Sequence, residues 1–312
     1  MALVDRIRSI AYFILIALMV LASALAVSEP AAARGILALR VDGVMRSAVI
    51  VEREPLKRQR RRVIIVLHGS HSSGARIRQR LSLDRLIGYS GVVLVYPNAI
   101  KGRWNVSETA MGKGADLRFI MALRNNLIRR GIAQKHHIFL AGVSTGASMV
   151  LAVACREPSM FVGFGAVLGN MPALLKDHCK PPRPLPLLVV NATGDKMMPF
   201  AGGATVRLDY PGPVLSAQAT LEPFLSAAHC KVALGKLATT EKTLVPLAPK
   251  SRLGVRIDKF AGCEVPVEEV TVVGGGHVIP GRHFGPRGHH GRRHIVGVDT
   301  AQMIFGFSQQ LR

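Results

Sequence analysis

The chain has 312 residues, of which 49% are hydrophobic and 19% charged, and it contains no long polar tract. This length and composition fit one large folded domain with a buried core, and they exclude a fibrous or disordered chain. The formal net charge of +22 favours association with anions such as nucleic acid, lipopolysaccharide or acidic polymers. We adopt the simpler interpretation of a basic surface, with nonspecific association with anionic surfaces and no specific nucleic-acid partner.

The amino-terminal segment has the pattern of an export signal. Two arginines precede an almost unbroken apolar run over residues 13–27, and three alanines at 31–33 supply a cleavage site. The run is short for a membrane-spanning helix, and an uncleaved anchor is the alternative. We therefore predict a signal peptide over residues 1–33 and a single catalytic domain over residues 34–312. The mature protein is expected to be secreted or periplasmic, with no membrane attachment.

Short apolar runs dominate the strand signals. Residues 35–51 alternate around Asp42-Gly43, which predicts an opening β-hairpin. Continuous apolar runs without alternation then recur along the chain, at residues 63–67, 92–96, 137–141, 187–190 and 270–273. Such runs predict strands that are buried on both faces of a parallel sheet.

Helical patterns lie between these runs, at residues 117–130, 144–156, 216–230 and 300–310. Pro223 predicts that the third helix begins only near Thr220. Residues 232–253 are weakly patterned and are interpreted as a loop or an edge hairpin. The alternation of strands and helices predicts an α/β fold, with a mostly parallel, doubly wound sheet and helices on both faces.

The strongest chemical signal is Gly142-Val143-Ser144-Thr145-Gly146. A serine hydroxyl is a poor nucleophile until it is exposed, oriented and given a base. A G-x-S-x-G turn between a strand and a helix exposes the serine on a sharp bend, where side chains at the flanking positions would clash. The apolar run before the motif and the helical pattern after it supply this context. Ser144 is therefore the predicted nucleophile.

An oxyanion hole is expected beside the serine, from a loop that follows an earlier strand. His68-Gly69-Ser70 follows the apolar run at 63–67, and Gly69 lets the backbone bend close to the site. We predict that the backbone N–H groups of Ser70 and Thr145 hold the developing negative charge. His68 is interpreted as structural, because it ends the strand beneath the site.

The acid and the base are expected after later strands. Asp195 lies just past the run at 187–190 and is predicted to orient the base, with a loop-capping aspartate as the alternative. His277 follows three glycines at 274–276 and the run at 270–273, and it is predicted to take the serine proton. The alternative for His277 is a loop histidine without a partner.

Neither the cysteines nor the histidines indicate a metal site. Four cysteines permit two disulfides in an exported chain and leave three pairings open: Cys155, Cys179, Cys230 and Cys263. Their spacings are not those of a zinc site. The histidines of residues 281–293 are metal-ligand candidates, but this Gly-, His- and Arg-rich segment is interpreted as an exposed loop. We predict no metal and no cofactor.

These motifs resemble the polyhydroxybutyrate depolymerase and feruloyl esterase family of secreted α/β-hydrolases, over roughly residues 35–310. The chain order serine, acid, base is the order of that fold. The matching blocks are Val41-Asp42-Gly43 with Arg46, Val66-Leu67-His68-Gly69, Trp104-Asn105, Asp116 with Phe119-Ile120, Arg183-Pro184-Leu185-Pro186, Thr193-Gly194-Asp195 with Pro199, Gly202-Gly203, and Gly274-Gly275-Gly276-His277 with Pro280-Gly281.

The resemblance implies a serine esterase that hydrolyses carboxylic esters without a cofactor. It also implies one disulfide between Cys230 and Cys263 and suggests a second between Cys155 and Cys179. The implied substrates are, in order, a 3-hydroxybutyrate oligomer, a feruloyl or acetyl ester of plant polysaccharide, and a small ester. With four tyrosines, one tryptophan and no visible polymer-binding module, the chain favours soluble esters over solid polymer.

The chain departs from the family at positions that bear on the substrate. Ile279 stands where members usually have a tryptophan, and with Trp104 it is a candidate for the wall of the substrate pocket. Thr145, Ala147 and the basic stretch after Gly281 are also unusual. The alternative of another class is a catalytically silent protein that binds anionic polymers on a hydrolase scaffold.

Overall fold

The computed structural model describes residues 33–52, 62–88, 91–206, 212–233, 236–237, 239–246, 254–281 and 298–311. The predicted signal peptide, apart from its last residue Ala33, and the histidines of residues 281–293 lie outside these ranges. Residues Ala32–Arg312 form one compact unit. Among the described residues, no helix has both the length and the apolar character that crossing a bilayer requires.

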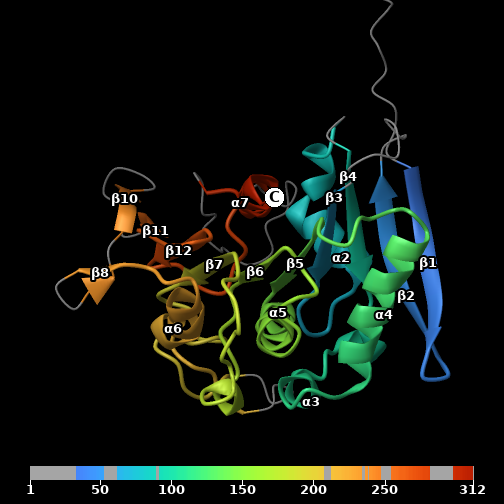
Figure 1. Ribbon diagram of the computed structural model, residues 1–312, viewed down its shortest axis with the longest axis horizontal. Helices are drawn as coiled ribbons and strands as arrows, with labels where there is room; N and C mark the ends of the chain where they lie inside the picture. Colours follow the sequence, from blue (N-terminus) through green and yellow to red (C-terminus); the bar gives the residue numbers. More distant parts are fainter. Residues whose placement is uncertain are drawn as a thin grey trace, which may run out of the picture. The chain divides into compact units, whose positions relative to one another are not determined.

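A sheet of ten strands forms the centre of this unit (Figure 1), in the order β1-β2-β4-β3-β5-β6-β7-β12-β11-β10. Its strands are β1 (Ala33–Val41), β2 (Val44–Glu52), β3 (Arg62–Leu67), β4 (Val92–Pro97), β5 (Ile138–Val143), β6 (Gly163–Val167), β7 (Leu187–Ala192), β10 (Thr239–Pro246), β11 (Gly254–Phe260) and β12 (Val267–Val273). The neighbours from β4 to β12 are parallel, and both margins are antiparallel. The expected mostly parallel sheet is confirmed.

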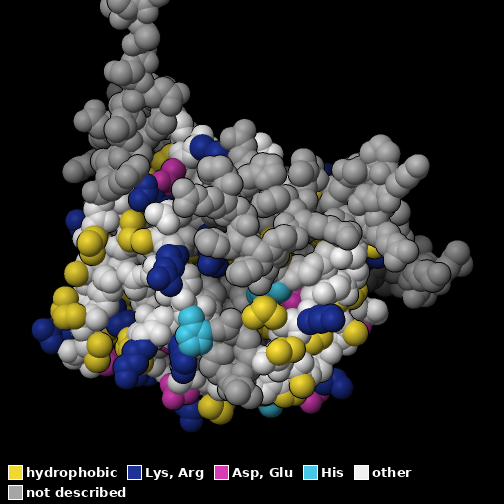
Figure 2. All heavy atoms as spheres, turned by 180° about the vertical axis from the view of Figure 1, so that it is seen from behind, with side chains coloured by type: hydrophobic (Ala, Val, Ile, Leu, Met, Phe, Trp, Pro, Cys, Tyr) yellow, Lys and Arg dark blue, Asp and Glu magenta, His cyan; other side chains and the backbone are white. Residues whose placement is uncertain are grey.

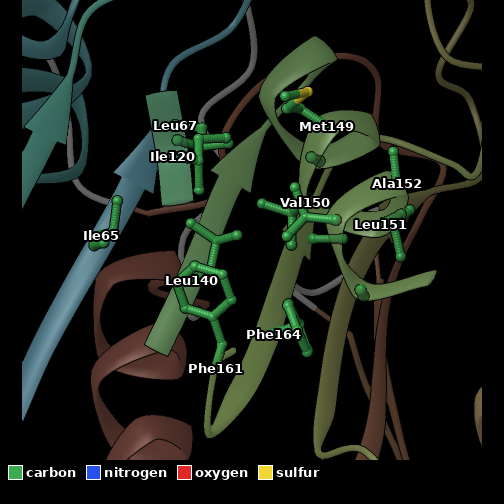
Figure 3. Close-up of a cluster of buried hydrophobic side chains, with 14 of the residues drawn as sticks. Ile65, Leu67, Ile120, Leu140, Met149, Val150, Leu151, Ala152, Phe161 and Phe164 are labelled. Atoms are coloured by element: carbon green, nitrogen blue, oxygen red, sulfur yellow. The ribbon is translucent and has the colours of Figure 1, made fainter. Parts of the chain in front are cut away.

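Helices cover both faces of the sheet. They are α2 (Gly74–Leu81), α3 (Val106–Ala110), α4 (Ala115–Arg129), α5 (Thr145–Arg156), α6 (Ala217–Ala227) and α7 (Thr300–Gln310), with the 3₁₀ turns η1 (Leu83–Arg85), η2 (Ile100–Gly102) and η3 (Ala173–Leu175). Apolar side chains of α3, α4, α5 and α6 share one buried cluster with the sheet, and those of α2 and α7 share another. Figure 3 draws part of the first cluster, in which Leu140 of β5 and Ile120 of α4 gather around Val150 of α5.

The opening hairpin is confirmed in its predicted register. Val41 pairs with Val44, and the two turn residues Asp42 and Gly43 have φ values of 50° and 77°. Two consecutive positive φ values are what a two-residue turn needs to match the twist of its strands. From β2, Arg46 crosses to α4 and binds the Asp116 carboxylate at 2.6 Å, with both side chains buried.

Several elements of the structure were not predicted from the sequence, among them α3 and β11. The strand β6 (Gly163–Val167) was not predicted, and two of its five residues are glycines, which are depleted in strands. Both glycines leave room for the Phe139 ring, which a Cβ at Gly163 or Gly165 would approach to 3.2 or 3.1 Å. Helix α2 was also missed. Residues 232–253, interpreted as a loop or an edge hairpin, contain the antiparallel pair of β8 (Val232–Ala233) with β9 (Lys236–Leu237) and the edge strand β10, which agrees with the second alternative.

Helix α6 begins earlier than the proline predicts. It runs from Ala217 with Pro223 inside it, rather than from Thr220. Ser216 is the cap, since its side chain accepts a hydrogen bond from the backbone N–H of Ala219 at 3.0 Å. The cap and the burial of Leu221 and Phe224 against the core outweigh the one helical hydrogen bond that a proline removes.

Candidate active site

Ser144 occupies the sharp bend between β5 and α5. Its φ of 58° and ψ of −123° place a non-glycine residue in a rarely populated backbone conformation. The flanking glycines make this bend sterically feasible. A Cβ at Gly142 would lie 2.3 Å from the Gly146 carbonyl oxygen, and one at Gly146 would lie 2.5 Å from the His68 carbonyl oxygen. The predicted strand–turn–helix setting of the serine is therefore present.

The structure brings Ser144, Asp195 and His277 together, although 133 positions separate the serine from the histidine. The His277 Nε2 lies 2.9 Å from the Ser144 Oγ, and the His277 Nδ1 lies 2.6 Å from the Asp195 Oδ2. An ionised carboxylate only accepts hydrogen bonds, so Nδ1 carries the ring proton and Nε2 is the acceptor for the serine hydroxyl. This is the arrangement that a general base needs.

Asp195 is held by its own loop. Its Oδ1 accepts hydrogen bonds from the backbone N–H groups of Met197 at 2.8 Å and Met198 at 2.9 Å. Its Oδ2 is therefore directed at the histidine, with the carboxylate buried. The capping geometry that was the alternative for Asp195 is thus present on one oxygen, while the other oxygen contacts His277.

The acid loop and the histidine loop are joined by hydrogen bonds. The Gly194 N–H donates to the Gly275 carbonyl at 2.8 Å, and the Gly274 N–H donates to the Thr193 Oγ1 at 2.8 Å. A Cβ at Gly194 would come within 2.8 Å of the same Gly275 oxygen, so this glycine permits the close approach. The two loops, which follow the parallel neighbours β7 and β12, form one support for the imidazole.

The predicted oxyanion loop lies against the serine. A Cβ at Gly69 would lie 3.1 Å from the Ser144 Cβ, so only a glycine backbone fits there without displacement. The Ser70 hydroxyl donates to the Thr145 Oγ1 at 3.1 Å, which joins the two residues named for the oxyanion hole. Thr145 is the first residue of α5, where a helix leaves backbone N–H groups without an intrahelical acceptor. Oxyanion binding by these two N–H groups stays a prediction.

His68 has the structural position expected for it. The side chain is fully buried, and its Nε2 accepts a hydrogen bond from the Ala99 N–H at 3.1 Å. The proton must then be on Nδ1, which donates to the Gly69 carbonyl at 2.7 Å. Burial lowers the pKa of the His68 imidazole and so favours this neutral form. His68 thus fixes the carbonyl of the glycine that faces the nucleophile.

Trp104 supports the same loop. Its indole Nε1 donates to the His68 carbonyl at 2.8 Å, and the two rings lie 5.2 Å apart between centroids. Its side chain is buried within the first core cluster. Ile279 is half-buried and packs against the second cluster. Contact of either side chain with substrate stays a prediction.

Sequence reasoning missed a buried polar network behind the triad. The Asn170 side chain donates to the Pro199 carbonyl at 2.9 Å and accepts from the Asn191 side chain at 3.2 Å. The Ser148 hydroxyl of α5 donates to the Asn170 carbonyl at 2.8 Å. These bonds join the nucleophile helix to the loop that carries Asp195. The three residues come from separate elements, so no local motif marks them.

Both disulfides that the resemblance implied are present. Cys155 near the end of α5 is bonded to Cys179, and Cys230 after α6 is bonded to Cys263 between β11 and β12. Two disulfides are compatible with an exported protein. In the described part of the chain, no group of three or more His, Cys, Asp or Glu side chains is placed to hold a metal ion.

Comparison with known proteins agrees with this fold. No protein-family model matches the chain. "Putative esterase NocK" from Nocardia uniformis subsp. tsuyamanensis is 26% identical over 240 residues, which cover 72% of this chain and 67% of that protein. Among solved structures, acetyl xylan esterase from Aspergillus awamori is similar with a TM-score of 0.57 at 13% identity, over 88% of this chain and 99% of that one.

A second similar structure is a cold-adapted esterase from an Arctic intertidal metagenomic library. Its TM-score is 0.50 at 14% identity, over 90% of this chain and 95% of that one. At such identities a structural likeness shows the fold alone. The chain accordingly has the α/β-hydrolase fold, and the serine of its strand–turn–helix bend lies where Asp195 and His277 meet.

Proposed function

We propose that the chain is a serine carboxylester hydrolase that uses Ser144 as nucleophile, His277 as base and Asp195 as orienting acid. One observation carries this proposal: His277 lies within hydrogen-bond distance of both partners, at 2.9 Å from the serine oxygen and 2.6 Å from the carboxylate. The similarity to a Nocardia protein described as an esterase supports ester hydrolysis as the reaction class.

The geometry supports a two-step reaction through an acyl-serine. The Ser144 Oγ attacks the ester carbonyl while its proton passes to the His277 Nε2. The backbone N–H groups of Ser70 and Thr145 hold the resulting oxyanion. The protonated His277 then gives its proton to the departing alkoxide, and the C–O bond of the ester breaks. A water molecule, deprotonated by the same nitrogen, releases the acid and restores the serine.

The proposed substrate is a 3-hydroxybutyrate ester, on the resemblance of the chain to polyhydroxybutyrate depolymerases. A feruloyl or acetyl ester of plant polysaccharide is the alternative, and the acetyl xylan esterase among the similar structures fits that alternative. The two disulfides support export, which would give the enzyme access to extracellular esters.

Hydrolysis of a small ester panel tests the proposal. Wild type, Ser144→Ala and the control Ser226→Ala are assayed on 4-nitrophenyl butyrate, a 3-hydroxybutyrate dimer and methyl ferulate. Ser226 is an exposed serine of α6, so its loss should change nothing. We expect kcat for Ser144→Ala to fall by about 10⁴-fold or more. Retention of most activity by Ser144→Ala would contradict the proposal, and the order of kcat/KM values across the panel ranks the substrate classes.

A further inference from the structure

Three exposed basic side chains beside the nucleophile occupy unfavourable positions. His71 and Lys101 are non-glycine residues in the left-handed backbone region, with φ values of 54° and 50°. Each such residue costs about 1 kcal/mol or more relative to ordinary backbone. Arg76 lies in the first turn of α2, at the positive end of the helix dipole, and no acidic residue accompanies it there.

His71 lies in the loop after β3, Arg76 in α2 and Lys101 in the η2 turn, and these segments meet next to the predicted oxyanion loop. His71 follows Gly69 by two positions, and Gly69 lies against Ser144. The His71 N–H donates to the Gly102 carbonyl at 2.9 Å, which joins the loop after β3 to the η2 turn that contains Lys101. The Arg76 guanidinium lies 3.4 Å from the His71 carbonyl oxygen. These three basic residues therefore belong to chain segments that meet next to the Gly69 backbone.

Close backbone packing fixes the relative position of these loops. The Gly74 N–H at the start of α2 donates to the Asn98 side chain at 2.8 Å. A Cβ at Gly74 would lie 2.2 Å from the Tyr96 carbonyl oxygen, so the helix start is pressed onto the end of β4. A Cβ at Gly102 would lie 3.0 Å from the Ser72 carbonyl oxygen. The backbones that carry these basic residues are therefore held in one relative position.

The net charge of the protein does not by itself explain this arrangement. Figure 2 shows Lys and Arg side chains scattered over one face of the molecule, with few acidic side chains between them. A basic surface of that kind requires no strained backbone and no cation at a helix start. Violations of local rules that converge at one place are typical of functional sites. A carboxylate near the Arg76 guanidinium or the Lys101 ammonium would gain a favourable charge interaction.

We propose that His71, Arg76 and Lys101 form an anion-recognition element that selects esters bearing a carboxylate near the scissile bond. This inference rests on the proposed function and deepens it, because it names a charge that the substrate carries. A short hydroxyacid oligomer has such a carboxylate at one end. A neutral polysaccharide ester does not have one. The element therefore favours soluble acidic esters over neutral ones.

A matched pair of esters tests the element. 4-Butyryloxybenzoate and 4-butyryloxybenzamide share the acyl group and differ in the charge of the leaving group. The kcat/KM ratio of the anionic to the neutral ester is measured for wild type, Lys101→Asn and Arg76→Gln, at low salt and at high salt. Asparagine tolerates the left-handed backbone of position 101, so the loop is retained. Lys135→Asn is the control, an exposed lysine just before β5 at the opposite end of the strand.

We expect the ratio to fall by about three- to tenfold in Lys101→Asn and by less in Arg76→Gln, which is the size of a partly exposed charge interaction. Added salt should reduce the wild-type ratio toward that of Lys101→Asn. The control should keep the wild-type ratio. Ratios that stay at the wild-type value in both variants while both esters are hydrolysed would overturn the element alone. Failure of wild type to hydrolyse either ester would instead overturn the proposed function, and the element with it.

Discussion

The two halves of the candidate site are held in place by different physical means. The nucleophile half, formed by β3, β5 and α5, depends on backbone contacts so close that Gly69, Gly142 and Gly146 admit no Cβ at ordinary distance. The acid–base half, after β7 and β12, depends on hydrogen bonds such as those from Met197 and Met198 to Asp195. Steric exclusion therefore positions the serine, and directed polar contacts position its partners.

This difference predicts different responses to substitution. A Cβ added at Gly142 or Gly146 would lie 2.3–2.6 Å from backbone atoms. This clash can be relieved only if a strand or a helix moves. Substitutions of these glycines in the nucleophile half should therefore lower stability and activity together. Hydrogen bonds in the acid–base half set proton positions, so substitutions there should lower activity while the fold is retained.

The largest expected effect belongs to Asp195→Asn in the acid–base half. The N–H groups of Met197 and Met198 require an acceptor, so the amide oxygen is held on them and the amide NH₂ faces the His277 Nδ1. The ring proton then moves to Nε2, which can no longer accept from the serine. We expect kcat to fall by about 10⁴-fold. Thermal unfolding and steady-state hydrolysis, measured on the same preparation, test this prediction. A large loss of stability in Asp195→Asn would contradict the claim that substitutions in the acid–base half leave the fold intact.

Gly146→Ala is the matching change in the nucleophile half. The new Cβ would lie 2.5 Å from the His68 carbonyl oxygen and 2.6 Å from the Leu67 carbonyl oxygen. Both are backbone atoms, which cannot move aside as a flexible side chain can. We expect about 2–3 kcal/mol of destabilisation and a loss of kcat of about 10²-fold, because the serine is displaced. Gly306→Ala in α7 is the control. Nothing lies within 4 Å of its Cβ, and a helical Gly→Ala change should raise stability by about 0.5–1 kcal/mol.

Asn170→Ala tests how the halves are joined. Its side chain is buried and contacts Pro199 and Asn191, so truncation leaves two polar groups without their partner. We expect a loss of about 1–3 kcal/mol in the free energy of unfolding and a smaller loss of kcat, of about tenfold. Urea unfolding and kcat measured together check this. An unchanged kcat would mean that the acid loop keeps its position without the network.

The smallest expected effect concerns pH and His68. Burial lowers the pKa of His68, so the folded protein prefers the neutral imidazole. The stabilisation is fully present above the ordinary value of 6.5 and is lost as pH falls from there through the lowered folded pKa. His68→Gln keeps an acceptor for the Ala99 N–H and does not titrate. Its midpoint temperature should fall less than that of wild type between pH 7.5 and pH 5.

Local glycine signals made much of the candidate site predictable. Gly142 and Gly146 flank the serine, and Gly276 precedes the histidine, each at the end of an apolar strand. The backbone of such turns is constrained locally, so the sequence carries the information. The parallel part of the sheet was predictable for a similar reason, because a strand buried on both faces is a short continuous apolar run.

The unpredicted parts depend on contacts between distant segments. The strand β6 is glycine-rich because Phe139 and Leu311 pack against it, which no local pattern reveals. Asn170 lies after β6 and Asn191 lies within β7, so they meet only because these two strands are neighbours. The first turn of α2 contains an arginine where an acidic residue is usual, so its start signal is weak.

The most direct test of the proposed triad is intact-mass analysis after labelling with a fluorophosphonate. Wild type, Ser144→Ala and Asp195→Asn are treated in parallel under conditions in which all three are folded. We expect one adduct on wild type, none on Ser144→Ala, and much slower labelling of Asp195→Asn, because an activated serine requires the correctly oriented His277. A folded wild-type protein without an adduct, or an adduct retained by Ser144→Ala, would contradict the catalytic assignment of Ser144.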